Sequence, residues 1–422
     1  IKHIETLRAL APECTVLLKK NGDFPLSSPC KIALFGSGAR KTLKGGTGSG
    51  DVNSRFFVTA EQGLINAGFE VTGEKWRDEY DITYASARKR FIKDLTAEAL
   101  KARINPIVYG MGAVMPEPDY SIPLEGEGDT CIYVLSRICG EGNDRKDIKG
   151  DFRLTESEVR DILACRKNYK KFMLVLNVGS VVDLSPVMSV ENILVLGQLG
   201  VVTGDVIADI LLGKAYPSGK LTTTWAGAEG YPNAGSFGEN NETSYNENIY
   251  VGYRWFDTLN KSVYFPFGYG LGYTDFNISY VSAQKSGRFA EITAKVENIG
   301  TLPGKETVQL YASIPNGRLD HPTRQLCGFA KTNELMPGEK ELVTITLDTT
   351  RLASYDTENA AYFMEKGEYI LSLGCSSRDN IPVVKLVLEE EIITKKLSNV
   401  GGNPGIVEFV PSNPAAVEVI SP

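Results

Sequence analysis

The sequence predicts a multi-domain protein in which an α/β domain with a mostly parallel sheet precedes an all-β sandwich. Three observations lead to this prediction. A chain of 422 residues is longer than one ordinary domain. Continuous apolar runs alternate with helix-like segments through its first half, which is typical of parallel sheets covered on both faces. Near Phe276 the pattern changes to short alternating strands without helices, which is typical of a sandwich.

The expected elements of the first half follow in order. Short apolar runs that end in glycine or polar residues are predicted strands, and segments with 3.6-residue spacing are predicted helices. Thr155 and Glu158 form a capping box, so a helix is expected to begin there. The predicted strands are "KIALFG" from Lys31, "TCIYVLS" from Thr130, "FMLVLNVGS" from Phe172 and "NILVLGQLG" from Asn192. The predicted helices cover "TAEQGLINAG" from Thr59, residues 82–102, "TESEVRDILACRKNYK" from Thr155 and "TGDVIADILLGK" from Thr203.

The second half contains short strands separated by turn signals such as "PGK", "PNG" and "PGE". The quoted strands are "FNISYVSA", "FAEITAKVEN", "ETVQLYASI", "ELVTITLD" and "GEYILSLGC". The last stretch is rich in Pro, Gly and Asn, and it is interpreted as a linker or extended tail. We therefore expect an α/β domain over residues 1–270, a β-sandwich over 271–394 and a tail over 395–422.

Composition narrows the classes of function. The formal net charge of −7 gives no basic patch for nucleic acid, and no run approaches the 18 apolar residues of a membrane span. Seven widely spaced cysteines without a C-x-x-C pair favour a reducing compartment, and the N-terminal stretch does not resemble a signal peptide. A cytoplasmic, bacterial protein is therefore expected. Two histidines, His3 and His321, leave little material for a Ser-His-Asp triad or a zinc site, so no metal or cofactor is implied.

A glycine-rich loop from Gly36 to Asn53 follows the first predicted strand of the α/β domain. It does not fit a dinucleotide fingerprint, because Lys41 stands where a small residue is needed, and it lacks the Gly-Lys-Ser/Thr triplet of a P-loop. One interpretation is a flexible turn. The other is a loop whose backbone and Ser49 hydroxyl approach a polar ligand closely, which glycine permits because it has no Cβ.

Glu141 stands between two glycines just beyond the end of the strand from Thr130, with Arg145 nearby in the sequence. A solvated charged turn is the ordinary interpretation of such a stretch. The functional interpretation is a carboxylic acid on a loop that gives a proton to a leaving group. Glycosidases of the usual kind need a second carboxylate. Asp51, Asp144 and Asp151 lie in the same loops, but the sequence singles out none of them.

Several motifs together resemble one family, the glycoside hydrolase family 3 β-glucosidases, over roughly residues 10–385. The motif "VLSRICGEG" resembles the acid/base loop of that family, and "GGTGSGDVN" resembles its glycine-rich loop. The other matching stretches are "VLLKKNGDFPLS", "GKAYPSGKLTTTW", "IYVGYRWFDT", "FPFGYGLGYTDF", "VENIGTLPGKETVQLYAS", "LMPGEKE" and "GEYILSLGCSSRD".

The resemblance implies an α/β sandwich followed by a fibronectin type III-like domain, and a retaining hydrolysis of β-glucosides or oligosaccharides. It implies that Glu141 is the general acid/base. It also implies that Ser49, with Gly48 and Asp51 beside it, and Arg145 contact the substrate. No organic cofactor or metal is implied, and a homo-oligomer is compatible with the family.

One part of the family pattern is missing from the chain. The nucleophilic Asp of the family belongs to a TIM-like barrel and precedes a Trp, but none of the three tryptophans here follows an Asp. The barrel is therefore expected on a second chain, on a segment cleaved from this one, or after the sandwich in the gene. The alternatives are a β-xylosidase or β-N-acetylglucosaminidase of the same family, or a carbohydrate-binding or scaffold protein without catalysis.

Overall fold

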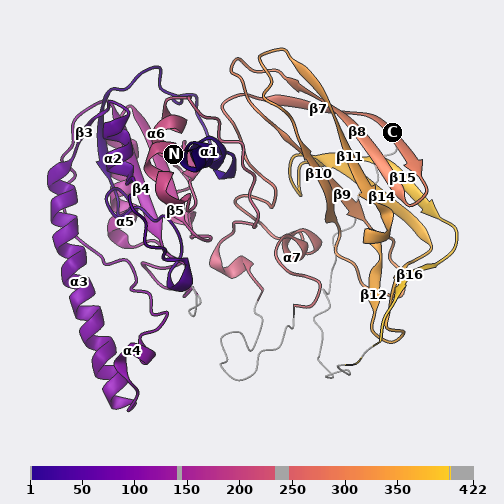
Figure 1. The fold of residues 1–422 in the computed structure, drawn as a ribbon, viewed down its shortest axis with the longest axis horizontal. Helices are drawn as coiled ribbons and strands as arrows, with labels where there is room; N and C mark the ends of the chain where they lie inside the picture. The colour runs from indigo at the N-terminus through magenta and orange to yellow at the C-terminus, as the bar shows by residue number, and fades with distance from the viewer. Residues whose placement is uncertain (1, 140–144, 233–246, 399, 401–422) are drawn as a thin grey trace. The chain divides into compact units, whose positions relative to one another are not determined.

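The computed structural model describes residues 2–139, 145–232, 247–398 and 400, and these residues form two compact units (Figure 1). Unit 1 contains the residues up to 219 together with 271–273, and unit 2 contains residues 220–270 and the chain from 274 onward. This division by contacts groups residues 220–270 with the β-rich part of the chain. The domain boundaries expected from the sequence at 270 and 394 stay predictions.

Unit 1 is built around a six-stranded sheet with the order β1-β6-β5-β4-β2-β3. Only β1 runs antiparallel to its neighbour, so the expectation of a mostly parallel sheet is confirmed. The strands are β1 (Val16–Lys19), β2 (Lys31–Phe35), β3 (Glu70–Thr72), β4 (Thr130–Arg137), β5 (Lys171–Val178) and β6 (Ile193–Val195).

Burial explains why these strands have no polar face. All eight residues of β4 are buried, and so are seven of the eight in β5, because helices cover both faces of the sheet. The strand predictions from Lys31, Thr130 and Phe172 are confirmed. The run from Asn192 forms only the short strand β6, and the chain turns at Gly197 with a φ of +70°.

The helices of unit 1 are α1 (Lys2–Leu10), α2 (Ala60–Asn66), α3 (Glu74–Lys101), α4 (Pro106–Tyr109), α5 (Glu156–Asn168) and α6 (Thr203–Leu211). The predicted capping box is present at the start of α5, where the Thr155 side chain and the Glu158 side chain each bond the other's backbone N–H. α2 and α6 approach so closely that a Cβ on Gly63 would lie 2.0 Å from the carbonyl oxygen of Gly204.

The long helix α3 begins eight residues earlier than the helix predicted over 82–102. Figure 1 shows it running along the outer side of unit 1 and leading to α4. Its first turns carry the buried side chains of Trp76, Arg77 and Tyr80. Trp76 meets Phe35 of β2 edge to face, with 5.7 Å between the ring centroids. The prediction missed this start because two of the three buried side chains are polar or charged.

Unit 2 contains one α-helix, α7 (Tyr253–Thr258), and three antiparallel sheets among its described residues. The sheets have the orders β10-β9-β14-β15, β11-β8-β7 and β12-β13-β16. The strands are β7 (Phe276–Ser286), β8 (Phe289–Asn298), β9 (Thr307–Ser313), β10 (Gln325–Lys331), β11 (Lys340–Asp348), β12 (Ser354–Asp356), β13 (Ala361–Met364), β14 (Gly367–Gly374), β15 (Asn380–Leu388) and β16 (Ile392–Lys396).

The core of unit 2 lies between the two larger sheets. Alternate residues of β8 and β11 point into it, including Ile292, Val296 and Ile345, and β9 and β14 supply Leu310 and Leu371 from the facing sheet. This is the packing of a β-sandwich, so the predicted all-β second half is confirmed. In the part of the chain that the structure describes, no helix is both long and apolar enough to span a membrane.

Candidate active site

The carboxyl ends of β2, β4, β5 and β6 meet at one edge of the sheet in unit 1, because these strands are parallel. β2 and β4 are neighbours in the sheet, and the chain goes on from β2 to β3 on one side and from β4 to β5 on the other. In open α/β sheets, ligands bind beyond the carboxyl ends of the strands at such a switch point. The loops that follow β2 and β4 are those singled out in the sequence.

The loop after β2 begins with a close approach of backbone to backbone. Gly36 has a φ of +94°, and a Cβ there would lie 2.3 Å from the carbonyl oxygen of Val134 in β4. Gly38 donates its N–H to the same oxygen at 2.9 Å. These contacts fix the start of the loop against β4, which explains two of its glycines.

Further along this loop, Gly48–Gly50 form one turn of 3₁₀ helix, closed by a 3.1 Å bond from the Asp51 N–H to the Gly48 carbonyl. The Asp51 side chain is 73% exposed, 3.8 Å from the ammonium of Lys44. The side chain of Ser49 lies outside the described part. The sugar contacts proposed for Gly48, Ser49 and Asp51 therefore stay predictions.

The loop after β4 includes Glu141, and neither Glu141 nor Asp144 is among the described residues. The anchors on either side of them are described. Arg137, the last residue of β4, donates to both carboxylate oxygens of Glu158 at 2.8 and 2.5 Å. Its Nε donates to the backbone carbonyl of Asp151 at 3.0 Å. Arg137 therefore joins β4, the start of α5 and the returning end of the loop.

The Arg137–Glu158 ion pair is buried, since the two side chains are 4% and 1% exposed. Burial alone would lower the pKa of Arg137, but the Glu158 carboxylate more than offsets this and raises it overall. Arg137 is therefore a permanent cation at the base of the loop. Two charges buried in this way are costly to separate, because either one alone would be left without a partner.

Asp151 holds the returning end of the loop through its carboxylate. It accepts hydrogen bonds from the Arg145 Nε and, at 2.8 Å, from the backbone N–H of Lys146. One residue earlier, Gly150 accepts a 2.7 Å bond from the Glu117 N–H. Gly150 has a φ of +83°, and a Cβ there would lie 2.3 Å from the Glu117 carbonyl oxygen. Asp151 is therefore a structural anchor of the loop.

Arg145 connects this loop with the neighbouring ones. Its Nη1 donates to Ser180, just after β5, at 2.9 Å and to the Cys139 sulfur at 3.5 Å. The carbonyl of Cys139 accepts a 3.4 Å bond from the N–H of Thr47, which precedes the Gly48 turn. The structure thus brings Arg145 and the glycine-rich loop into contact with the same residue, Cys139.

Three buried polar atoms in this region have no hydrogen-bond partner in the described structure: Arg145 Nη2, Gln198 Nε2 and Thr47 Oγ1. Gln198 follows β6, and a Cβ placed on Gly179 would lie 3.1 Å from both its Nε2 and the Cβ of Cys139. Buried donors are normally satisfied. Free donors from three loops suit a ligand with several oxygen atoms, such as the hydroxyls of a sugar.

The sequence prediction missed Gln198, Ser180 and Thr47. A signal for two of them was present, because each follows an apolar strand and one glycine, in "NVGS" and "LGQ". Polar residues at that position reach the ligand edge of a parallel sheet.

A cavity of about 100 Å³ lies beside these loops, at the carboxyl ends of β2 and β4. It is lined by Ser37, Lys41, Leu43, Tyr80, Tyr84, Val114, Met115, Glu117, Ser136, Arg137, Ile138, Gly150 and Asp151. Within it, the Tyr80 hydroxyl donates to the carboxyl group of Glu117. Burial of that carboxyl group and the negative charge of Glu158 raise the pKa of Glu117 to about 7, against the opposing effect of Arg137. Sequence reasoning gave no role to Glu117.

No group of three or more His, Cys, Asp or Glu side chains in the described residues could hold a metal ion. The donors that line the edge are guanidinium, amide, hydroxyl and carboxyl groups. This set suits hydrogen bonding and proton transfer to an uncharged, oxygen-rich ligand.

Two family models match the chain. The glycosyl hydrolase family 3 C-terminal domain matches residues 15–273, and the fibronectin type III-like domain matches residues 306–377. The resemblance inferred from the motifs is therefore confirmed, and so is the predicted architecture of an α/β domain followed by a fibronectin type III-like sandwich.

Curated relatives carry the names of glycosidases. Beta-glucosidase A of Butyrivibrio fibrisolvens is 36% identical, over 94% of this chain and 52% of its own length. A beta-glucosidase of Ruminococcus albus is 35% identical, over 94% of this chain and 42% of its own. An exo-alpha-(1->6)-L-arabinopyranosidase of Bifidobacterium breve is 34% identical, over 54% of this chain and 30% of its own.

Solved structures agree with these relatives. A beta-glucosidase of Paenibacillus barengoltzii superposes with a TM-score of 0.79 at 31% identity, over 94% of this chain and 44% of its own. Beta-glucosidase 3B of Thermotoga neapolitana, in complex with alpha-D-glucose, gives a TM-score of 0.78 at 32% identity, over 93% of this chain and 55% of its own. This chain thus spans about half the length of the relatives that it matches, and it belongs to glycosyl hydrolase family 3.

Proposed function

We propose that this chain supplies the general acid/base of a retaining β-glucosidase, which removes terminal non-reducing β-D-glucosyl residues, and that Glu141 is that acid/base. The observation that carries the proposal is how the loop is held. Arg137 and Asp151 fix its two ends at the carboxyl edge of the sheet, beside the glycine-rich loop. A catalytic acid must be carried on a loop with firmly held ends if it is to meet one particular oxygen atom of a substrate.

In the proposed reaction, a carboxylate nucleophile attacks the anomeric carbon while Glu141 gives its proton to the departing glycosidic oxygen. A covalent glycosyl-enzyme forms and the aglycone leaves with that proton. Glu141, now ionised, takes a proton from water as the water attacks the anomeric carbon, which regenerates both carboxyl groups and releases the sugar with retained configuration. The two carboxyl groups of a retaining enzyme stand ~5 Å apart.

The nucleophile in this proposal comes from a TIM-like barrel outside the present chain. The relatives support this, because this chain corresponds to only about half of their length. The barrel would lie on a second chain or on an adjoining segment. The present chain would supply the acid/base loop, and its described residues Arg145, Gln198 and Thr47 would supply unpaired donors for the sugar hydroxyls.

A second specificity is suggested by one relative, the arabinopyranosidase of Bifidobacterium breve. β-Xylosidase and β-N-acetylglucosaminidase are the other candidates within the family, and a non-catalytic carbohydrate-binding or scaffold role is the candidate outside it. Initial rates on the p-nitrophenyl derivatives of β-glucose, β-xylose, β-N-acetylglucosamine and α-L-arabinopyranose separate the catalytic candidates. The proposal expects the highest kcat/KM on the β-glucoside.

The test begins with the protein as it occurs. The material is purified, its polypeptides are measured by intact mass and on a denaturing gel, and the same sample is assayed on p-nitrophenyl β-glucoside. Activity that co-purifies with a barrel-sized polypeptide, or with a longer chain that includes this one, supports the proposal. If the source contains neither a barrel-sized polypeptide nor a longer chain, and the homogeneous 46.1 kDa chain binds glucosides but hydrolyses none, the binding-module alternative is favoured.

A further inference from the structure

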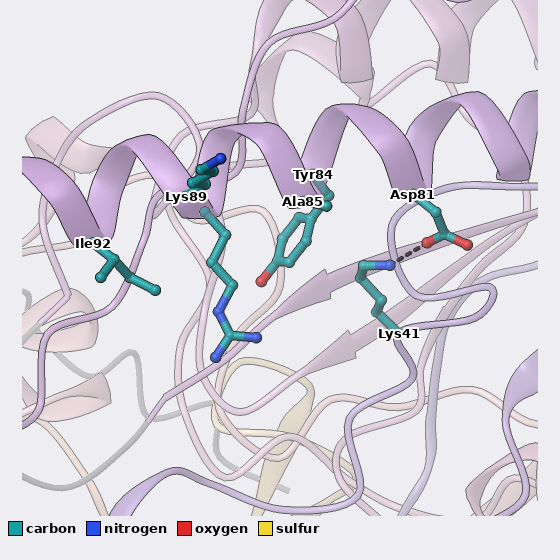
Figure 2. Close-up of a pocket in the computed structure, with 7 residues that line it drawn as sticks. Lys41, Asp81, Tyr84, Ala85, Lys89 and Ile92 are labelled. Atoms are coloured by element: carbon teal, nitrogen blue, oxygen red, sulfur yellow. Dashed lines mark hydrogen bonds and ion pairs between the residues drawn. The ribbon is translucent and has the colours of Figure 1, made fainter.

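An open cavity of about 470 Å³ lies between one face of α3 and Lys41 of the loop after β2, and Figure 2 shows the side chains around it. Its lining residues are Lys41, Asp81, Tyr84, Ala85, Arg88, Lys89 and Ile92. All except Lys41 lie on α3 at spacings of mainly three and four residues, so they form one face of the helix. The volume falls within the range of small-molecule sites, about 300–1,000 Å³.

Positive charge is in excess in this cavity. It is lined by three cationic side chains and one carboxylate, which leaves two positive charges, in a chain whose net charge is −7. The only carboxylate, Asp81, is already used, since it accepts from Lys41 and, at 3.3 Å, from Arg40. No hydrogen bond or ion pair to the side chains of Arg88 and Lys89 is found among the described residues.

The hydroxyl of Tyr84 is a third donor available to a ligand. Figure 2 shows the Tyr84 ring projecting from α3 toward the side where Lys41 lies, and the Lys41 ammonium lies 5.0 Å from the ring centroid. Burial and the charge of Glu117 raise the pKa of Tyr84, against the opposing effect of Arg88, so the hydroxyl keeps its proton. It too lacks a hydrogen-bond partner in the described structure.

The rest of the cavity wall is apolar. Ala85 and Ile92 lie on the same helix face, and Ile92 is 52% exposed. A ligand that satisfies the free donors and also covers these side chains needs an oxyanion attached to a compact apolar body. A bare phosphate suits the site less well, because it would leave the apolar side chains of Ala85 and Ile92 uncovered.

Lys41 and Tyr84 line both this cavity and the smaller cavity of about 100 Å³ at the carboxyl ends of β2 and β4. The smaller cavity is also lined by Glu117, Arg137 and Ile138. A ligand on α3 would therefore lie next to the candidate active site without occupying it. This position distinguishes the cavity from the donors of Arg145, Gln198 and Thr47.

We propose that the face of α3 formed by Tyr84, Arg88, Lys89 and Ile92, together with Lys41, binds a small organic carboxylate with an aromatic or compact aliphatic body. The carboxylate accepts from Arg88 and the Tyr84 hydroxyl, Lys41 and Lys89 add positive charge around it, and the apolar body covers Ala85 and Ile92. Binding at this site requires no barrel and no catalytic step, so it can be tested independently of the proposed glycosidase activity.

The test is isothermal titration calorimetry of the 422-residue chain with benzoate, and then with inorganic phosphate and glucose as comparison probes. Benzoate is expected to bind, and its affinity is expected to fall about tenfold in Arg88→Gln and several-fold in Tyr84→Phe, because each loses a hydrogen bond to a charged group. Lys93→Gln is the matched control. Lys93 is exposed on the same helix but does not line the cavity, and its loss should leave the affinity unchanged.

Three results would overturn the proposal. The first is that benzoate does not bind, or binds equally well to the wild type and Arg88→Gln. The second is that phosphate binds more tightly than benzoate with the same dependence on Arg88, which would make this a bare oxyanion site. The third is that neutral glucose binds as well as benzoate. Circular dichroism and melting of each variant show that a lost affinity is not a lost fold.

Discussion

At the scale of single residues, Glu117 connects the pH of the solution to the stability of unit 1. Its pKa is raised to about 7 from a usual value of 4.5, so the folded chain holds a proton there that the unfolded chain releases. Protonation of Glu117 therefore makes the free energy of unfolding larger below pH 4.5 than at alkaline pH. This contribution to stability is lost as the pH rises from 4.5 to 7. It amounts to about 3 kcal/mol over that interval.

Glu117→Gln should remove this dependence, because an amide stays neutral at every pH and can still accept from the Tyr80 hydroxyl. We expect the variant to gain melting temperature relative to the wild type at pH 8, and to gain little or nothing at pH 4.5, by scanning calorimetry. Glu125→Gln is the control, since Glu125 is exposed and pairs with Lys75 on the surface. Equal shifts at both pH values in Glu117→Gln would refute the raised pKa.

Arg137 is the residue on which the anchoring of the acid/base loop depends most. Arg137→Met leaves the Glu158 carboxylate buried without its partner, and we expect a loss of about 3–5 kcal/mol of stability in urea unfolding. The double variant Arg137→Met, Glu158→Leu should recover much of that loss, because no charge is left unpaired. Arg153→Ala is the comparison, since its pair with Asp147 is half-exposed and should matter little. If Arg137→Met is as stable as the wild type, the role of Arg137 as the main anchor of the loop is contradicted.

At the scale of elements, the contact between α2 and α6 holds one layer of unit 1 together. A Cβ on Gly204 would lie 1.9 Å from the carbonyl oxygen of Thr59, so the two helices could not keep their separation. Gly204→Ala should lower the melting temperature of unit 1 by roughly 6 °C or more. Gly50→Ala is the control, because a Cβ there meets nothing within 4 Å. If both variants have the melting temperature of the wild type in calorimetry, α2 and α6 do not approach as closely as described.

The elements also indicate what the sequence could and could not predict. Continuous apolar runs identified β2, β4 and β5, and the Thr155–Glu158 capping box identified the start of α5, because these signals lie in adjacent residues. The first turns of α3 were missed, since Arg77 and Tyr80 are buried there without an apolar period.

The residues of the candidate site also fall into those that the sequence could indicate and those that it could not. The loop motif pointed to Arg145, which the structure places at this edge of the sheet, because the whole signal lies in a few adjacent residues. The assignment of Glu141 from the same motif stays a prediction. Gln198, Ser180 and Glu117 reach the same edge of the sheet from distant segments, and they meet there only because of the strand order. A single sequence does not determine that order.

At the scale of the whole molecule, one family model covers residues 15–273 and a different one covers residues 306–377, and the relatives are about twice as long as this chain. The account assigns the acid/base to unit 1 and the nucleophile to a barrel. The 422-residue chain alone is therefore expected to leave p-nitrophenyl β-glucoside unhydrolysed above the buffer rate. Turnover by a homogeneous 46.1 kDa chain would show that the chain contains a nucleophile of its own.

The most direct test of the central claim is the leaving-group dependence and azide rescue of Glu141→Ala in the intact, barrel-containing protein. We expect the variant still to release good leaving groups such as 2,4-dinitrophenolate, which need no proton, whereas the release of poor leaving groups nearly stops. Added azide should restore turnover and yield β-glucosyl azide, because it attacks the glycosyl-enzyme without a base. Equal losses for good and poor leaving groups, with no glucosyl azide formed, would contradict the role of Glu141 as general acid/base.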